Sequence, residues 1–174
     1  MEPPGAYRRY LGADGTAVRI IGQRRSAILL TSQNIAVLNR ALILVAEDEA
    51  IIALDVAMAI RDAGGEVAGP AASVKQALAL IDTMPVAGAI LDVNLSDGDI
   101  SPVAEILLAA GIPIIIQTGV GLPADLIARY PDLAVQIKPC ASEGLVSQLA
   151  LLIAARQTAQ KGPHFYQHTG RCQL

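Results

Sequence analysis

The feature that most constrains the fold is a regular alternation, from residue 41 onward, of short apolar runs with segments of helical spacing. Between the runs, apolar residues recur at three- and four-residue intervals, as they do along one face of a helix. Strands that alternate with helices predict a parallel sheet covered on both faces, and nearly continuous apolar strands suit such a sheet. The five runs are 42–46, 66–69, 86–91, 112–116 and 133–137.

Several of the intervening segments carry signals for the ends of helices. Ser73 and Gln76 have the spacing of a capping box. The Ser101–Pro102 pair predicts a cap followed by a proline in the first helical turn. Gly64–Gly65 is expected to end a helix that begins near Glu49.

Composition and charge exclude several classes of protein. The longest apolar stretch, residues 106–116, contains Gly and Pro and is shorter than the roughly 20 residues of a spanning helix. The N-terminus lacks the apolar segment of a signal peptide. We therefore expect a cytoplasmic protein with no membrane partner, in which Cys140 and Cys172 stay reduced. Residues 41–174 carry seven basic and fourteen acidic residues, which argues against nucleic-acid binding.

Polar side chains follow four of the five runs, at the point where each predicted strand ends. In an open parallel sheet this edge holds the ligand site. The second run ends in Gly69–Pro70, as expected for an edge strand beside that site. The candidate site residues are Glu47 and Asp48 after the first run, Asp92 after the third, Thr118 after the fourth and Lys138 after the fifth.

Carboxylates that converge in this way need a cation between them. Two carboxylates about 4 Å apart repel each other by roughly 4 kcal/mol at an effective dielectric constant near 20. Mg²⁺ is a suitable ion, because it binds one or two carboxylates together with water and phosphate oxygens. Lys138 can reach a phosphoryl oxygen, and Thr118 can donate a hydrogen bond to another. Asp92 can then act as an oxygen nucleophile and form an aspartyl-phosphate.

These residues and their order resemble the receiver domains of two-component response regulators. The matching motifs are the acid pair in ILVAEDE, the acceptor in ILDVNLSDG, the hydroxyl in IIIQTG and the Lys-Pro pair in VQIKP. The resemblance implies a flavodoxin-like, doubly wound α/β fold, with five helices and a five-stranded parallel sheet of order 2-1-3-4-5. We accordingly divide the chain into an N-terminal extension of unknown role (1–40), a receiver domain (41–157) and a C-terminal tail (158–174).

The resemblance also implies a function, that of a bacterial phosphoprotein in signal transduction. A histidine kinase or histidine phosphotransferase of a two-component system or phosphorelay would transfer a phosphoryl group to Asp92. We expect a stand-alone receiver that signals by contact with a downstream protein target. Its own catalysis would be limited to slow self-dephosphorylation, so we do not expect an enzyme. The sequence leaves open whether the protein forms a homodimer.

The metal ligands and one peptide bond are implied by the same resemblance. Mg²⁺ would be held by Asp48, Asp92 and the backbone carbonyl of Asn94. Glu47 would act mainly through a metal-bound water. The Lys138–Pro139 peptide bond is expected to be cis, an isomer that bonds before proline adopt at modest cost.

The chain departs from the family pattern at the residues expected to transmit the signal. Val135 stands three positions before Lys138, where typical receivers carry an aromatic switch residue. The segment PVAEILLAAGIPIIIQTG resembles a receiver subgroup whose fourth strand ends in Phe-Ala-Thr-Gly, but Ile116 and Gln117 replace the Phe and Ala. We therefore expect any switch to work through the loop and short helix at 119–130.

Three alternative functions compete with that of a phosphoacceptor. A pseudo-receiver that acts as an interaction module without phosphorylation is the main one. A haloacid-dehalogenase-type phosphatase would need an acid two residues after its nucleophile, where this chain has Asn94. A flavin phosphate would be repelled by the acids at 47–49. The apolar segment 49–62 is either a docking surface for a phosphohistidine helix or an ordinary packed helix, possibly beneath the extension.

Overall fold

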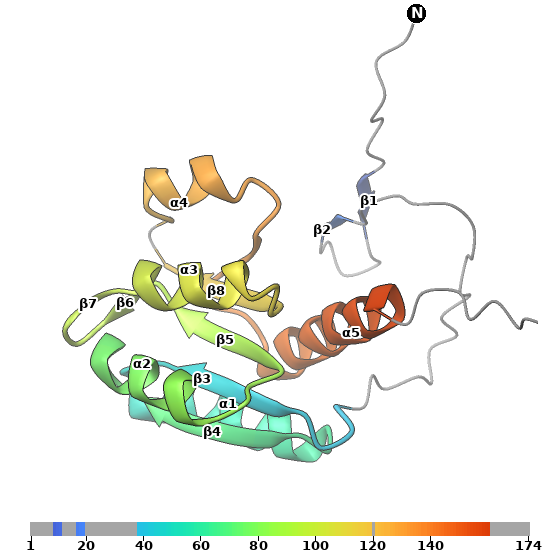
Figure 1. Cartoon of the computed structure of the whole chain (residues 1–174), viewed down its shortest axis with the longest axis horizontal. Coiled ribbons are helices and arrows are strands. Elements are labelled where there is room, and N and C mark those ends of the chain that lie inside the picture. The colour runs from blue at the N-terminus through green and yellow to red at the C-terminus, as the bar shows by residue number, and fades with distance from the viewer. Residues whose placement is uncertain (1–8, 12–16, 20–37, 120, 161–174) are drawn as a thin grey trace, which may run out of the picture. The chain divides into compact units, whose positions relative to one another are not determined.

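The computed structural model describes residues 9–11, 17–19, 38–119 and 121–160. Contacts divide the chain into two units, Met1–Asn34 and Ile35–Leu174. In the first unit, β1 (Arg9–Leu11) pairs antiparallel with β2 (Ala17–Arg19). All other described elements belong to the second unit (Figure 1). Cys172 lies outside the described residues, and the predicted domain limits stay predictions.

A five-stranded parallel sheet forms the centre of the second unit. Its order, β4-β3-β5-β8-β9, is 2-1-3-4-5 when these strands are numbered along the chain, which confirms the predicted topology. Every neighbouring pair in this sheet is parallel. The strands are β3 (Leu42–Ala46), β4 (Glu66–Ala71), β5 (Gly88–Asp92), β8 (Ile114–Thr118) and β9 (Ala134–Ile137).

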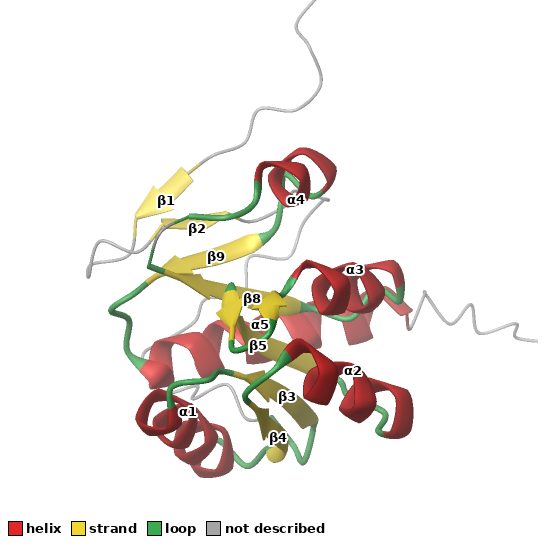
Figure 2. Ribbon diagram, turned by 90° about the vertical axis from the view of Figure 1, so that its left-hand side faces the viewer, coloured by secondary structure: helices red, strands yellow, loops and turns green. Residues whose placement is uncertain are grey.

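Helices cover both faces of this sheet (Figure 2). One face carries α1 (Ala50–Asp62) and α5 (Ser142–Gln160). The other carries α2 (Val74–Thr83), α3 (Ser101–Ala109) and α4 (Ala124–Arg129). None of the helices in the described part of the chain has the length and apolar character needed to cross a membrane.

Each face of the sheet packs its own aliphatic core. Ile43, Ile90 and Ile115 pack with α1 and α5 on one face, whereas the neighbouring residues Leu44 and Leu91 pack with the helices of the other. This alternation follows from the two-residue period of a strand. Because both faces are covered, β3 and β5 are apolar along nearly their whole length, which is the pattern that predicted a doubly covered sheet.

Two strands extend further along the chain than the apolar runs that predicted them. β5 and β8 begin two residues later than expected and end at Asp92 and Thr118. Asp92 pairs with Gln117, and Thr118 pairs with Ile137. The parallel ladder therefore continues past the apolar run, and the polar residues are the last residues of their strands rather than the first of the loops.

The predicted end of the second strand is wrong. β4 continues through Gly69–Pro70 to Ala71, with a shift of register opposite Leu44 and Ala46. The Gly69–Pro70 peptide bond is cis. A proline inside a strand is tolerated here because β4 is an edge strand, with one side free of ladder hydrogen bonds.

One predicted helix cap is confirmed and one is wrong. At α2, the Ser73 hydroxyl accepts a hydrogen bond from the Gln76 N–H at 3.2 Å, which is the first half of a capping box. Gln76 Oε1 accepts from the Ala72 N–H at 2.9 Å, one residue before the position of the second half. At α3, Ser101 is the first helical residue rather than the cap. The Ser101 N–H donates to Asp99 Oδ1 at 2.9 Å, so the Asp99 side chain caps the helix in place of Ser101.

Candidate functional site

The predicted site residues lie at the carboxyl edge of the sheet. Asp92 and Thr118 are the last residues of β5 and β8, Glu47 follows β3, and Lys138 follows β9. Glu47, Asp92 and Thr118 are buried. Residues that lie as far as 91 positions apart in the sequence thus come to one edge because all five strands run in the same direction.

Lys138 joins two of the acids directly. Its Nζ donates to Glu47 Oε2 at 2.7 Å and to Asp92 Oδ2 at 2.8 Å. Short charge-assisted hydrogen bonds of this kind are stronger than those between neutral groups. The Lys138–Pro139 peptide bond that follows is cis, as predicted.

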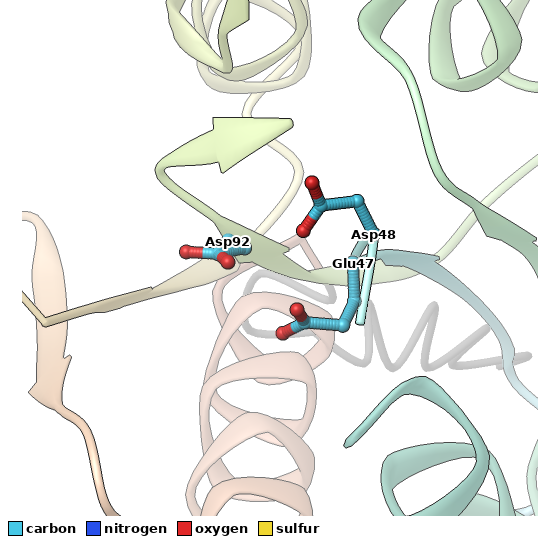
Figure 3. Close-up of side chains that lie close together, drawn as sticks. All are labelled: Glu47, Asp48 and Asp92. Carbon is cyan, nitrogen blue, oxygen red and sulfur yellow. The ribbon is translucent and has the colours of Figure 1, made fainter. Parts of the chain in front are cut away.

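Glu47, Asp48 and Asp92 form a cluster of carboxylates (Figure 3). One oxygen from each lies within 4.8 Å of the others. Glu47 Oε1, the oxygen that does not contact Lys138, accepts a hydrogen bond from the Glu49 N–H at 3.2 Å. With a single ammonium group against three carboxylates, the ionised cluster keeps an excess of negative charge. Hard oxygen ligands with such an excess suit Mg²⁺, so these residues fit the predicted ion.

The two groups that pair most closely both have displaced pKa values. Burial raises the pKa of Glu47, and although the hydrogen bond from Lys138 opposes this, the charge of Asp92 adds to it. Burial works to lower the pKa of Lys138, but hydrogen bonds to Asp92 and Glu47 outweigh it and raise that pKa. The two shifts therefore favour the charged form of Lys138 and disfavour the ionised form of Glu47, which would add a negative charge beside Asp92.

The hydroxyl of Thr118 is bound to the loop that follows β8. Thr118 Oγ1 donates to the backbone oxygen of Gly121 and accepts from the N–H of the same residue, both at 2.8 Å. The backbone oxygen of Thr118 accepts from the Lys138 N–H at 2.9 Å. Thr118 thus lies at the predicted edge, next to the ends of β5 and β9, but its side chain contacts Gly121.

A hairpin follows Asp92, where the sequence predicted only a polar turn. Asn94, proposed as a ligand through its carbonyl, lies in β6 (Asn94–Leu95), which pairs with β7 (Gly98–Asp99). The turn is fixed to α2, because the Asp97 carboxylate accepts from the N–H groups of Val74 and Lys75 at 2.6 and 3.1 Å. These bonds, that of Lys75 first, lower the pKa of Asp97. The hairpin was missed, although a short polar turn with Gly after Leu95 is a signal from which it could have been predicted.

A hollow of about 530 Å³ opens beside Lys138. It is bounded by the first half of α1 and by residues 138–142, and Ile51 and Cys140 both line it. Next to it α1 exposes a stripe of apolar side chains, Ile51, Leu54 and Met58, that are 85%, 57% and 54% accessible. We call these three residues the α1 stripe. The described residues of the second unit do not cover it, and packing beneath the N-terminal extension, the alternative expected from the sequence, involves residues outside the described ranges.

The fourth helix is short, as the sequence predicted, and Val135 lies in the strand that follows it. Val135 lies in β9, opposite Ile116, on the face of the sheet that α4 covers. α4 has six residues and packs through Leu126. The expectation that a switch would work through the loop and short helix at 119–130, without an aromatic side chain at position 135, stays a prediction.

Comparisons with known proteins support a signalling receiver. No protein-family model matches the chain. Two curated relatives are named transcriptional regulatory protein PdtaR, one from each of two strains of Mycobacterium tuberculosis. Each is 30% identical to this chain over 116 residues. The match covers 64% of this chain and 56% of theirs, so the chain spans little more than half the length of these relatives.

Solved structures give the same result. The response regulator PhyR from Brucella abortus superposes with a TM-score of 0.62 at 26% identity, over 75% of this chain and 54% of that one. A response regulator receiver protein from Sinorhizobium medicae superposes with a TM-score of 0.59 at 28% identity, over 68% of this chain and 98% of that one. The second unit therefore has the fold of a response regulator receiver domain.

Proposed function

We propose that residues 41–157 form a receiver that accepts a phosphoryl group on Asp92 from the histidine of a partner kinase or phosphotransferase. The reaction is Mg²⁺-dependent, and the output is a contact with a downstream protein. The observation that carries this proposal is the pair of hydrogen bonds from Lys138 Nζ to Asp92 and Glu47, at 2.8 and 2.7 Å, beside a third carboxylate. A nucleophilic carboxylate needs such a neutralising group when a phosphoryl group approaches.

The transfer uses the residues in defined roles. An oxygen of Asp92 attacks the phosphorus of the phosphohistidine, a phosphorus–oxygen bond forms and the phosphorus–nitrogen bond breaks. The imidazole nitrogen leaves with the electron pair and takes a proton from water. Lys138, already 2.8 Å from Asp92, holds positive charge against the phosphoryl oxygens. Thr118 donates its hydroxyl hydrogen to another phosphoryl oxygen. Asp92 is thus a phosphoacceptor in a signalling protein and not the nucleophile of a turnover enzyme.

Mg²⁺ would be held by Asp48 and Asp92, together with the backbone carbonyl of Asn94. When bound, it would offset the negative charge of the acids and of the phosphoryl group. Both oxygens of Glu47 have partners, Lys138 and the Glu49 N–H, which supports an indirect role for this acid through water.

The partner's histidine-bearing helix would dock on the α1 stripe and the adjoining hollow. The stripe is apolar and exposed, and Ile51 belongs both to the stripe and to the lining of the hollow. Lys138 lines the same hollow, so a helix seated there reaches the phosphoacceptor site from this side. The chemistry that this surface fits is an amphipathic helix.

The test is phosphoryl uptake from acetyl phosphate, measured as the intact mass of the protein. Wild-type protein should gain one phosphoryl group with Mg²⁺ and none with a chelator. Asp92→Asn should gain none, and the control Asp82→Asn, which changes an exposed acid on α2, should behave as wild type. Equal uptake by Asp92→Asn would refute the proposal. No uptake by any form, with an unchanged amide spectrum on adding beryllofluoride and Mg²⁺, would instead support the pseudo-receiver.

A further inference from the structure

Gln117 places a buried amide beside the proposed phosphoacceptor. It pairs with Asp92 in the ladder between β5 and β8, and it is 3% exposed. Ile90 and Ile115 pack on the face of the sheet that α1 and α5 cover. Asp92 and Gln117 lie two residues further along the same two strands, so their side chains point to that face as well. The amide and the carboxylate therefore lie on one face, at the ends of neighbouring strands.

The amide of Gln117 is bound to the loop that carries Lys138. Gln117 Nε2 donates to Cys140 Sγ at 3.2 Å. The next residue of β8, Thr118, accepts the Lys138 N–H on its backbone oxygen at 2.9 Å. The last two residues of β8 thus hold Lys138 and the residue two positions after it. Pro139 lies between these two contacts, and its ring fixes φ, which limits how far one contact can move without the other.

We infer that Gln117 is a positioning residue for the proposed phosphoryl transfer: by binding Cys140, it keeps Lys138 in contact with Asp92 and Glu47. This inference rests on the proposed function, because it adds a residue to the same site. The long side chain of a lysine loses rotamer freedom when it is held in one geometry. A fixed backbone restricts the region that the ammonium group can reach, and so favours its contacts with the two acids, at 2.7 and 2.8 Å.

The far end of the same loop is fixed by a separate contact. Ser142, the first residue of α5, is buried, and its hydroxyl donates to Asp55 Oδ2 of α1. Leu145 and Leu149 hold α5 in the core beyond this point. Loss of the Gln117 contact should therefore loosen the loop near Lys138 and leave α5 attached to the domain.

Gln117→Met tests the inference through two quantities that should change in opposite directions. The variant replaces the amide with an apolar chain of similar length, so the Cys140 contact is lost while the space stays filled. A loosened Lys138 competes less with a cation, so Mg²⁺ alone should bind about threefold more tightly, as expected for the loss of one hydrogen bond. Uptake from acetyl phosphate should slow by about the same factor. General damage to the site would weaken both, and weaker Mg²⁺ binding would overturn the inference.

A matched glutamine and a double variant separate this effect from packing. Gln136 is the ladder partner of Gln117 in β9, and its amide donates to Gln148 Oε1 of α5 at 2.7 Å. Gln136→Met should therefore bind Mg²⁺ and take up phosphoryl groups as wild type does. In a Lys138→Met background, Gln117→Met should change neither quantity further, because its effect passes through Lys138. Additive effects, or the same changes in Gln136→Met, would contradict the inference.

Variants of Cys140 test the contact from its other side. Cys140→Ala removes the acceptor and should reproduce the changes of Gln117→Met, whereas Cys140→Ser keeps an acceptor and should retain the wild-type Mg²⁺ affinity. Wild-type Mg²⁺ affinity in Cys140→Ala, in a domain whose amide spectrum shows it to be folded, would overturn the inference.

Hydrogen exchange at the Lys138 amide needs neither metal nor phosphate. This amide donates to Thr118, and it should exchange about threefold faster in Gln117→Met than in wild type. Unchanged exchange, in a protein that takes up phosphoryl groups normally, would overturn this inference alone. Faster exchange in Gln117→Met, with no phosphoryl uptake by wild type, would overturn the proposed function and leave the control of Lys138 by Gln117 in place.

Discussion

Lys138 is the residue on which the charge balance of the site depends. It is the ammonium group that donates to Glu47 and Asp92, and its side chain is 17% exposed. Its attraction for the two acids resembles that of a bound cation, so in the proposed reaction it would both assist an incoming phosphoryl group and compete with a metal ion. These two roles make opposite predictions for its removal.

Lys138→Met should bind Mg²⁺ more tightly and take up phosphoryl groups more slowly. The tighter binding follows because one positive charge no longer offsets the three carboxylates, and at roughly 4 Å such a charge is worth about 1–4 kcal/mol. We expect a change of about tenfold or more in each quantity. Magnesium titration and uptake from acetyl phosphate measure them, with Lys75→Met, an exposed lysine on α2, as the control. A variant that bound Mg²⁺ more weakly would contradict this account of Lys138.

For individual residues, the sequence predicted which side chains form the site better than it predicted their contacts. Glu47, Asp92 and Lys138 were expected at one edge because each follows a strand and parallel strands end together. The contact between Thr118 and Gly121 was not predicted, since it depends on the backbone of the loop. The Asp97 carboxylate was also missed as a cap, because the helix it caps begins 23 residues earlier in the chain.

Among the elements, α1 has the face that a partner would meet. Ile51→Asp should slow phosphotransfer from the cognate kinase by about tenfold or more, because it puts a charge into an apolar contact. Uptake from acetyl phosphate, which needs no docking, should be unchanged. The control is Ile106→Asp, an exposed apolar residue of α3 on the opposite face. If both variants received phosphoryl groups from the kinase equally fast, the α1 stripe would not be the docking surface.

The hairpin of β6 and β7 should stabilise α2 in a pH-dependent way. The pKa of Asp97 is lowered from its ordinary value of 3.8 by the N–H groups it accepts from, so its contribution to stability is present above pH 3.8 and is lost as pH falls through the lowered value. Asp97→Asn should therefore be less stable than wild type at pH 7, and the difference should shrink on acidification. Urea unfolding at several pH values measures it, with Asp82→Asn as the control. A difference independent of pH would assign the effect to something other than the carboxylate.

The ends of helices and strands were predicted correctly where nearby residues in the sequence determine them. The cap of α2 depends on Ser73 and Gln76, and the Ser73 hydroxyl accepts from the Gln76 N–H as expected, although the Gln76 side chain accepts from Ala72 and not from Ser73. The ends of β4, β5 and β8 depend on the neighbouring strand, which a single apolar run does not contain. The pairing of Asp92 with Gln117 extends β5 beyond its run, and the edge position of β4 lets it continue past Pro70.

For the whole molecule, a divalent ion should raise the stability of the second unit. The charge excess of the acid cluster opposes folding, and Mg²⁺ bound at the proposed site would offset it. At a concentration about 100 times its Kd, a ligand specific for the folded state adds about 2.7 kcal/mol. Thermal unfolding with and without Mg²⁺ measures this, and Asp92→Asn should show a smaller gain than wild type. The same gain in both proteins would place the ion elsewhere.

The central claim, that Asp92 carries the phosphoryl group, can be tested by locating the modified residue. Phosphorylated protein can be treated with borohydride, which reduces an acyl phosphate to an alcohol, and then digested and mapped by mass spectrometry. The account predicts homoserine at position 92 and unmodified aspartate at position 48. Homoserine at another position, or phosphate retained on a residue that borohydride does not reduce, would contradict it.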